Sequence, residues 1–289
     1  MGRHLNRAKS HFGTDTRGLL DGGRYALLHT RSLELDELRP YVPGDDVRDI
    51  DWRASARSGT VLIKRFVSEK HHKIVLVADA GRNSSALAPS GEVKRDIAAN
   101  VMGAVGLVSM ARSDEIGLVY GDSRGSVTIR SRRGETHIES LLERFYGHSS
   151  GAAGPSDMTA QLAYVARAHR TRLLLIVVSD EPDVTPELEQ AVQQLTGRHD
   201  VMWLLIADMP VIGADDKHDG FDVATGRFVL GGAALGPRVL AAYQAAESQR
   251  AANLDDFLSA NRVRFARVGA STEIRAKLVE LSQGYRHAG

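Results

Sequence analysis

The feature of this sequence that most constrains its fold is a set of three short apolar runs, each ending in an aspartate. They read KIVLVAD up to Asp79, RLLLIVVSD up to Asp180 and VMWLLIAD up to Asp208. Each run is rich in branched side chains and lacks alternation of apolar and polar residues, which is typical of a parallel strand covered on both faces. A chain of 289 residues that is 43% hydrophobic can bury the substantial core that such a sheet requires.

Helical patterns separate these runs along the chain. They cover 92–110, 156–169 and 186–195, and Thr185 followed by Pro186 suits the start of the last helix. Strand-like pieces over 115–120 and 126–130 flank a Gly-rich turn, which predicts an antiparallel hairpin. Strands that alternate with helices and include one hairpin predict an α/β fold. It should have a mostly parallel sheet, one antiparallel edge strand and helices on both faces.

The C-terminal part of the sequence adds a hairpin and helices to this pattern. A second hairpin over 221–230 has Thr225 and Gly226 at its turn, and a long amphipathic helix follows over 237–260. A strand near 263–268 and a closing helix from Ser271 come last. The stretch GHSSGAAGPSD resembles a linker, but it falls inside the α/β pattern and is predicted to be a loop.

Composition narrows the class of protein. Lys and Arg number 37 against 36 Asp and Glu, and this near-neutral balance makes nucleic-acid binding an unfavoured function. Cysteine is absent, which excludes disulfides and thiolate catalysis and fits an intracellular protein. The start lacks the apolar core of a signal peptide, and the longest apolar run, LLLIVV, is too short to span a bilayer. We therefore expect a soluble, cytoplasmic protein without a membrane span.

Two stretches resemble a known family. The segment PGDDVRDIDWRASARSGTVLIKRF, followed by IVLVADAGRNS, is similar to the bacterial family catalogued as domain of unknown function 58, and the resemblance covers most of the chain from Leu35. It implies a von Willebrand factor A-like α/β domain that works with an AAA+ ATPase of the MoxR type, and no enzymatic activity is established for the family. The implied organisation is an N-terminal extension over 1–70 and the α/β domain, with its C-terminal additions, over 71–289.

The resemblance also implies a place for a metal ion. Ligands collect at the carboxyl ends of the strands in open α/β sheets, and the von Willebrand A fold holds a divalent ion there through a D-x-S-x-S loop, a distant Thr and a distant Asp. Asp79 fills the first position, Gly81 and Asn83 replace the two serines, and Ser156 and Asp180 match the distant ligands. Two of these positions lack their usual oxygen ligand, so we expect a degenerate site with weak or absent Mg²⁺ binding. The alternative to a metal-binding role is that Asp79 only caps the loop that follows it.

The densest charge pattern lies in the N-terminal extension, around Trp52. Pro43 and Gly44 suit a type II turn, and Ile50 and Trp52 would share one face of an extended segment. The surrounding charged residues are Asp45, Asp46, Arg48, Asp49, Asp51, Arg53 and Arg57. One interpretation is a structural clamp, in which these charges pair among themselves and a buried Trp52 anchors the extension to the α/β domain. The other is a polar surface that binds a partner protein.

The sequence GDSRG formally matches the G-x-S-x-G pattern of serine hydrolases. That pattern requires a turn from a strand into a helix, whereas strand-like sequence lies on both sides of Ser123. We therefore predict that Ser123 is a turn residue and not a nucleophile.

These observations favour a non-enzymatic protein-interaction module, with a MoxR-type AAA+ ATPase as the implied partner and a chaperone-like or complex-assembly role. The contact surface is predicted at the carboxyl edge, where Asp79 and Asp180 would be free to bind basic side chains of the partner. The alternative is a divalent-metal-dependent enzyme that uses the aspartates Asp79, Asp180 and Asp208 of that edge.

Overall fold

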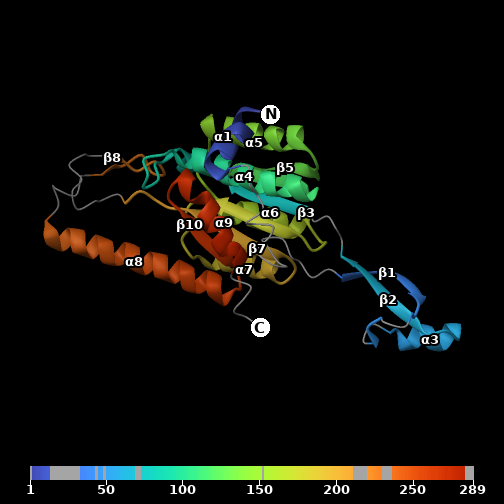
Figure 1. Ribbon diagram of the computed structural model, residues 1–289. Coiled ribbons are helices and arrows are strands. Elements are labelled where there is room, and N and C mark those ends of the chain that lie inside the picture. The colour runs from blue at the N-terminus through green and yellow to red at the C-terminus, as the bar shows by residue number, and fades with distance from the viewer. Residues whose placement is uncertain are drawn as a thin grey trace.

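A six-stranded sheet organises the molecule (Figure 1). The computed structural model describes residues 2–13, 33–42, 45–47, 50–68, 73–151, 153–210, 220–229 and 236–283. The strand order is β10-β7-β6-β3-β4-β5. The strands are β3 (Lys73–Asp79), β4 (Glu115–Asp122), β5 (Gly125–Arg132), β6 (Leu174–Ser179), β7 (Asp200–Ile206) and β10 (Arg264–Val268). Only β5, at one edge, runs antiparallel to its neighbour, so the predicted von Willebrand A-like sheet is confirmed.

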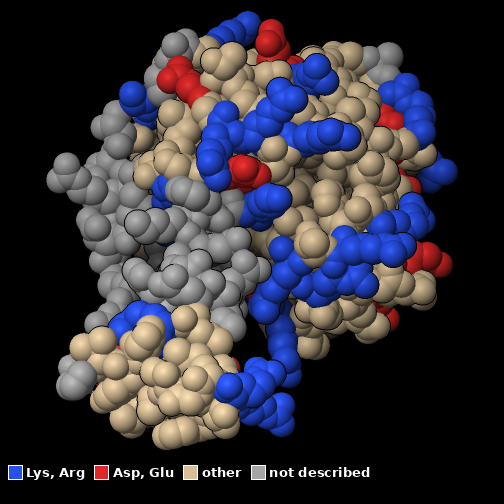
Figure 2. All heavy atoms as spheres, turned by 90° about the vertical axis from the view of Figure 1, so that its right-hand side faces the viewer, with Lys and Arg blue, Asp and Glu red and all other residues tan. Residues whose placement is uncertain are grey.

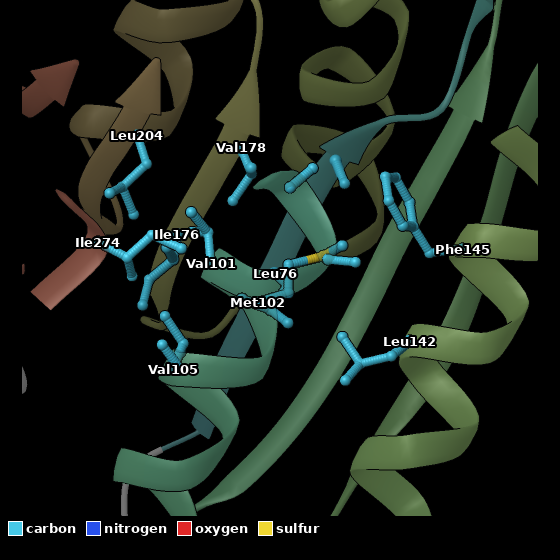
Figure 3. Packing of buried hydrophobic residues seen from close by; sticks show 14 of the residues in the cluster. Leu76, Val101, Met102, Val105, Leu142, Phe145, Ile176, Val178, Leu204 and Ile274 are labelled. Carbon is cyan, nitrogen blue, oxygen red and sulfur yellow. The ribbon is translucent and has the colours of Figure 1, made fainter. Parts of the chain in front are cut away.

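Helices cover both faces of this sheet. One face packs against α4 (Lys94–Arg112), α5 (Glu135–Ser150) and α9 (Ile274–Gln283). The other face packs against α6 (Met158–Ala168), α7 (Pro186–Thr196) and the last turns of α8 (Pro237–Ala260). Figure 3 shows the first of these cores, where Leu76 and Ile176 of the sheet meet Met102 of α4 and Phe145 of α5.

The central strand explains why the apolar runs lack alternation. Along β3, Ile74 and Leu76 point into the core beneath α4, while Val75 and Val77 point into the core beneath α6. A strand that is buried on both faces needs apolar residues at every position.

An N-terminal helix, α1 (Arg3–Phe12), also belongs to the packed core. Leu5 and Phe12 are buried in the cluster beneath α4 and α5. Glu139 of α5 accepts hydrogen bonds from the backbone N–H groups of His4 and Leu5, each at 2.8 Å, and so satisfies the first turn of α1. No helix was predicted for these residues. The boundary near residue 70 stays a prediction, but this part of the N-terminal region packs with the α/β domain.

A small unit lies apart from the sheet in Figure 1. It consists of the antiparallel strands β1 (Leu33–Pro40) and β2 (Leu62–Ser68) and the short helix α3 (Trp52–Ser58). Ile50, Ala54 and Ile63 are buried, and Ile50 forms an isolated bridge with Ile63. We call the described residues from β1 to β2, which are 33–42, 45–47 and 50–68, the projecting unit. The segment before α3 was predicted to be extended through Trp52, which is wrong because Trp52 begins a helix.

The remaining elements follow the sequence analysis closely. The elements that lie within a few residues of their predicted positions are the hairpin of β4 and β5, the helices α4, α6, α7 and α8, the strand β10 and the helix α9. In the second hairpin, β8 (Gly220–Phe221) pairs with β9 (Phe228–Val229). The helix α5 was missed, and the predicted loop at GHSSGAAGPSD begins inside it. Within the described residues, none of the helices combines the length and the apolar character needed to cross a bilayer.

Candidate functional site

Three aspartates gather at the carboxyl edge of the sheet, as predicted. Asp79 is the last residue of β3, Asp180 directly follows β6, and Asp208 lies two residues beyond β7. These strands are parallel, with β6 between β3 and β7 in the sheet, so their carboxyl ends meet. We refer to this region as the carboxyl-edge site.

The four residues predicted to form a degenerate metal site lie together. Asp79 is buried, and its Oδ1 accepts a hydrogen bond from the backbone N–H of Gly81 at 3.1 Å. The Oγ of Ser156 accepts from the backbone N–H of Asn83 at 3.1 Å, and the Nδ2 of Asn83 donates to Oδ2 of Asp180 at 2.7 Å. The loop after β3 is thereby fixed both to Ser156, just before α6, and to the end of β6.

The same contacts make these residues a poor fit for a divalent ion. Mg²⁺ requires oxygen ligands, whereas Asn83 turns its amide nitrogen toward Asp180. Gly81 cannot be exchanged for the missing serine without movement, because a Cβ at this position would lie 2.4 Å from the Cα of Ser156. Among the described residues there is also no group of three His, Asp or Glu side chains placed to hold a metal ion.

Lys94 was not among the predicted site residues, but its ammonium group enters this site. Lys94 is the first residue of α4, its side chain is only 3% exposed, and its Nζ is paired with Oδ1 of Asp208. Lys94 lines a cavity of about 10 Å³ together with Asp79, Asn83 and Asp180. A lysine in the first turn of a helix faces the positive end of the helix dipole. That unfavourable placement is the sequence signal that could have revealed a buried acidic partner.

Burial controls the protonation of the two inner aspartates. Burial, together with the neighbouring charge of Asp180, raises the pKa of Asp79 to about 6, although the Ser156 hydroxyl and backbone N–H groups oppose this rise. Burial also raises the pKa of Asp180, while Lys94 and the Asn83 hydrogen bond act in the opposite direction. The site therefore holds two carboxyl groups whose charge is costly and one cation that offsets it.

Arginines of α8 and β10 extend this charge compensation outward. Glu181 accepts from Nε of Arg267 at 2.6 Å and from Nη2 of Arg250 at 3.4 Å. Arg250 also lies 3.9 Å from Asp208. The expectation that the acidic side chains of this edge are free to bind a partner is therefore wrong for Asp180, whose carboxylate accepts from Asn83 of the same chain, and Asp208 is likewise paired with Lys94.

The structure corrects the predicted burial of Trp52. Its side chain is 68% exposed at the start of α3. Asp51 caps this helix by accepting hydrogen bonds from the backbone N–H groups of Arg53 and Ala54, each at 3.0 Å. Trp52 therefore does not anchor the extension as a buried clamp, and the second interpretation, a surface for a partner, stays a prediction.

The charges around Trp52 pair differently from the expectation. Asp45 accepts from Nη2 of Arg39 at 2.6 Å and from the backbone N–H of Val42 at 2.9 Å, contacts that hold the pKa of Asp45 below its ordinary value. Neither Arg53 nor Arg57 forms an ion pair with another described residue. Asp46 is exposed, and it is also not free of partners. The predicted turn at Pro43 and Gly44, and the residues Arg48 and Asp49, lie outside the described residues.

Ser123 lies in the turn between β4 and β5, as predicted, and not between a strand and a helix. The neighbouring Asp122 is buried and fixes this turn. It accepts from Nη2 of Arg124 at 2.5 Å, from the backbone N–H of Gly154 at 2.8 Å and contacts Nε2 of His148 at 3.1 Å. The Arg124 guanidinium, the Gly154 N–H and His148 together hold the pKa of Asp122 far below its ordinary value. These contacts give the turn a structural role.

Curated relatives of the chain are themselves uncharacterized. One protein of Mycobacterium tuberculosis (strain ATCC 25618 / H37Rv) and one of Mycobacterium bovis are each 23% identical over 203 residues, which is 70% of this chain and 63% of theirs. The chain thus spans less than two thirds of the length of these relatives.

Solved structures resemble the chain at low identity. An aerotolerance-related membrane protein from Bacteroides fragilis is 14% identical with a TM-score of 0.48, over 73% of this chain and 98% of that one. The SpRpn10 VWA domain is 11% identical with a TM-score of 0.38, over 74% of this chain and 98% of that one.

The family model described as protein of unknown function DUF58 matches residues 37–211, which include both the projecting unit's motif and the carboxyl-edge site. The chain belongs to this family.

Proposed function

We propose that this chain is a non-enzymatic protein-binding module and that it contacts its partner through the projecting unit. The observation that carries the proposal is the exposure of Trp52. Tryptophan has the largest side chain of the apolar residues, and 68% of Trp52 is exposed to solvent. A tryptophan buries roughly 150–250 Å² when it is covered, and Trp is enriched among the residues that dominate binding energy at protein interfaces.

Other apolar side chains of the projecting unit are exposed as well. They are Leu38, Val42, Val47 and Val61. Exposed apolar side chains that cluster in one small unit are typical of interaction surfaces, whereas single ones are normal anywhere on a protein.

Internal contacts hold this surface in place. Ser55 Oγ donates to the carbonyl of Asp51 at 2.7 Å and accepts from the backbone N–H of Leu62 at 2.8 Å, so α3 is fixed to β2. The Asp51 cap and the Ile50–Ile63 bridge hold the backbone on either side of Trp52. A preformed surface loses less conformational entropy when it binds. This gives a physical reason for the spacing of the Ile-Asp-Trp and Ser-Ala-Arg residues.

The contacts of the carboxyl-edge site support a non-enzymatic role over the alternative of a metal-dependent enzyme. An enzyme of that kind would use Asp79, Asp180 and Asp208 as ligands or as a base. Here Lys94 is paired with Asp208, Asn83 donates to Asp180, and Asp79 caps its own loop. We propose that this site stabilises the fold and does not perform chemistry.

For the partner we propose an AAA+ ATPase of the MoxR type, in a chaperone-like or complex-assembly role. This choice is based on the family to which the chain belongs. The exposed cations Arg53 and Arg57 beside Trp52 would suit an acidic rim on such a partner. Because the ATPase requires ATP, the proposal places the encounter in the cytoplasm.

Co-purification tests the proposal. A tagged form of this chain is expected to retain the MoxR-type ATPase of the same organism when ATP or a non-hydrolysable analogue is present. Trp52→Ala should lower the amount retained, whereas Phe221→Ala should not, because Phe221 is a comparably exposed aromatic residue (71%) in the second hairpin. Equal loss with both variants, or no association in any nucleotide state, would contradict the proposed partner.

A further inference from the structure

Basic residues gather at the amino edge of the six-stranded sheet. The strands β3, β4, β6, β7 and β10 are parallel, so their first residues meet at this edge, and the antiparallel β5 ends there with Arg132 opposite Ile116. Figure 2 looks onto the side of the molecule where β1 and β2 lie in Figure 1, the side on which β3 begins. Lys and Arg atoms cover much of it.

The chain brings a cation to this edge at nearly every strand. Lys73 begins β3, Arg170 lies between α6 and β6, and Arg262 lies between α8 and β10. The exposed cations of this edge whose side chains have no hydrogen bond or ion pair to another described residue are Lys73, Arg130, Arg132, Arg167, Arg170 and Arg262. We call this set the amino-edge cations.

Acidic residues at the same strand starts do not neutralise the amino-edge cations, because other arginines already pair with them. Their pairs are Asp114 with Arg112 at 3.4 Å, Glu115 with Arg133 at 3.6 Å and Asp200 with Arg172 at 2.9 Å. Glu135, in the first turn of α5, adds one further carboxylate on this side. The positive charge of the amino-edge cations therefore remains in excess.

Cations near the ends of helices often serve only to satisfy carbonyl groups, and two arginines here do so. Arg198 donates to the carbonyls of Ala166 and His169, and Arg264 donates to the carbonyl of Leu281 at 3.1 Å. The side chains of the amino-edge cations form no such bond within the described residues. Helix capping therefore explains Arg198 and Arg264 but leaves the amino-edge cations without an internal role.

The overall balance of charge conceals this surface. The formal net charge is only +1, which made nucleic-acid binding an unfavoured function at the level of composition. The fold separates the charges, however, because Asp79, Asp180 and Asp208 lie at the carboxyl edge, at the opposite ends of the same strands. A ligand meets the local field of one face and not the average over the chain.

The chemistry of the surface identifies the kind of ligand. None of the large hydrophobic side chains exposed in the described residues belongs to the first residues of the strands of the six-stranded sheet, so the strand starts themselves offer neither stacking platforms for single-stranded bases nor apolar groups for insertion into a bilayer. Six strands span about 24 Å, and duplex nucleic acid presents one phosphate charge per roughly 1.7 Å of its axis. We propose that the amino-edge cations bind the phosphate backbone of double-stranded nucleic acid without sequence specificity. This inference is independent of the protein-binding role of the projecting unit.

Fluorescence anisotropy with a labelled 25-base-pair DNA duplex, measured on the full chain at several salt concentrations, tests this inference. The wild-type chain is expected to bind with an affinity that falls steeply as salt rises. The double variant Arg132→Glu/Arg170→Glu should bind about tenfold more weakly, with a slope of log affinity against log salt reduced by about 2, because two phosphate contacts are lost. Both side chains are exposed, so the thermal unfolding of this variant should match that of the wild type.

A matched control carries the same change of charge elsewhere. Arg82→Glu/Arg238→Glu replaces exposed cations in the loop after β3 and at the start of α8, and it should bind the duplex as the wild type does. If both double variants lose the same affinity for the duplex, the effect comes from the net charge of the chain and not from the amino edge, and the inference is overturned. Binding to phosphatidylserine vesicles but not to the duplex would overturn it in favour of a membrane surface, and the absence of duplex binding at 50 mM salt would also contradict it.

Discussion

At the scale of single residues, the side chain of Lys94 supplies a positive charge among the carboxylates of the carboxyl-edge site. Its ammonium group is paired with Asp208 and acts on Asp180, and the carboxylates therefore remain close to one another without a metal. A cation that belongs to the chain cannot dissociate from the site as a bound ion can. The charged groups of the carboxyl-edge site are therefore satisfied mainly by one another.

Removal of this cation should destabilise the fold. We expect Lys94→Met, which keeps the apolar stem but not the charge, to lower the free energy of unfolding by about 3 kcal/mol at pH 7, because buried carboxylates lose their compensating partner. Urea denaturation measures the change. The control Arg82→Met replaces an exposed cation of the same edge and should have almost no effect. A Lys94→Met chain as stable as the wild type would show that Asp208 and Asp180 do not depend on Lys94.

Asp79 should make stability depend on pH. Its folded-state pKa, about 6, lies above the ordinary value of 3.8, so the folded chain binds this proton more tightly than the unfolded chain does. The contribution of Asp79 to stability therefore falls as pH rises from about 4 through 6. Asp79→Asn removes this loss, and the variant should gain about 3 kcal/mol relative to the wild type between pH 4 and pH 7. Parallel pH profiles of unfolding free energy for the two proteins would contradict the raised pKa.

Gly81 should resist the exchange that would complete a metal-binding loop. A side chain there would meet the backbone of Ser156, so Gly81→Ser is expected to cost about 1–3 kcal/mol of stability. Calorimetric titration with Mg²⁺ should detect no gain in affinity. The matched change at an open surface glycine, Gly147→Ser, has no atom within 4 Å of the new Cβ and should lack this cost of overpacking. Tight Mg²⁺ binding by Gly81→Ser would show that the loop can rearrange.

At the scale of elements, the projecting unit presents Trp52 to solvent while the strand β7 hides the other tryptophan. The chain has two tryptophans, and Trp203 is fully buried with its Nε1 donating to Ser179 Oγ at 2.9 Å. Trp203 therefore packs in the core, whereas Trp52 forms part of an exposed surface.

Acrylamide quenching of fluorescence can separate the two tryptophans. We expect one readily quenched component from Trp52 and one protected component from Trp203. Trp52→Phe should remove the quenched component and leave the melting temperature within about a degree, because an exposed side chain contributes little to stability. Two protected tryptophans, or a large fall in melting temperature, would mean that Trp52 is buried after all.

Elements marked by a continuous apolar run or by a clear start signal were predictable from the sequence, whereas some helices were missed. The buried strands β3, β6 and β7 stand close to their predicted bounds because short, continuous apolar runs mark them, and Pro237 marks the start of α8. The helix α1 has its buried residues Leu5, Ala8 and Phe12 at helical spacing, but it was missed because it is short and its burial depends on α4 and α5, which are distant in sequence. The short helix α3 escaped because its cap, Asp51, lies within a run of charges.

At the scale of the whole molecule, the fold separates charges that the composition averages away. Strand direction places Asp79, Asp180 and Asp208 at one edge and the amino-edge cations at the other. For the candidate site, the sequence predicted which carboxylates would meet, because parallel strands bring their ends together. It could not predict Lys94 or the arginines of α8 and β10, because their contacts depend on how the helices pack.

Affinity for the MoxR-type ATPase, measured by calorimetry on three forms of the full chain, tests the protein-binding role most directly. The wild type and Phe221→Ala should bind equally well. Trp52→Ala should bind about 30-fold more weakly, which corresponds to about 2 kcal/mol for the loss of a central aromatic contact, while its unfolding remains unchanged. If Trp52→Ala binds as tightly as the wild type, the projecting unit is not the contact surface and the proposed function is contradicted.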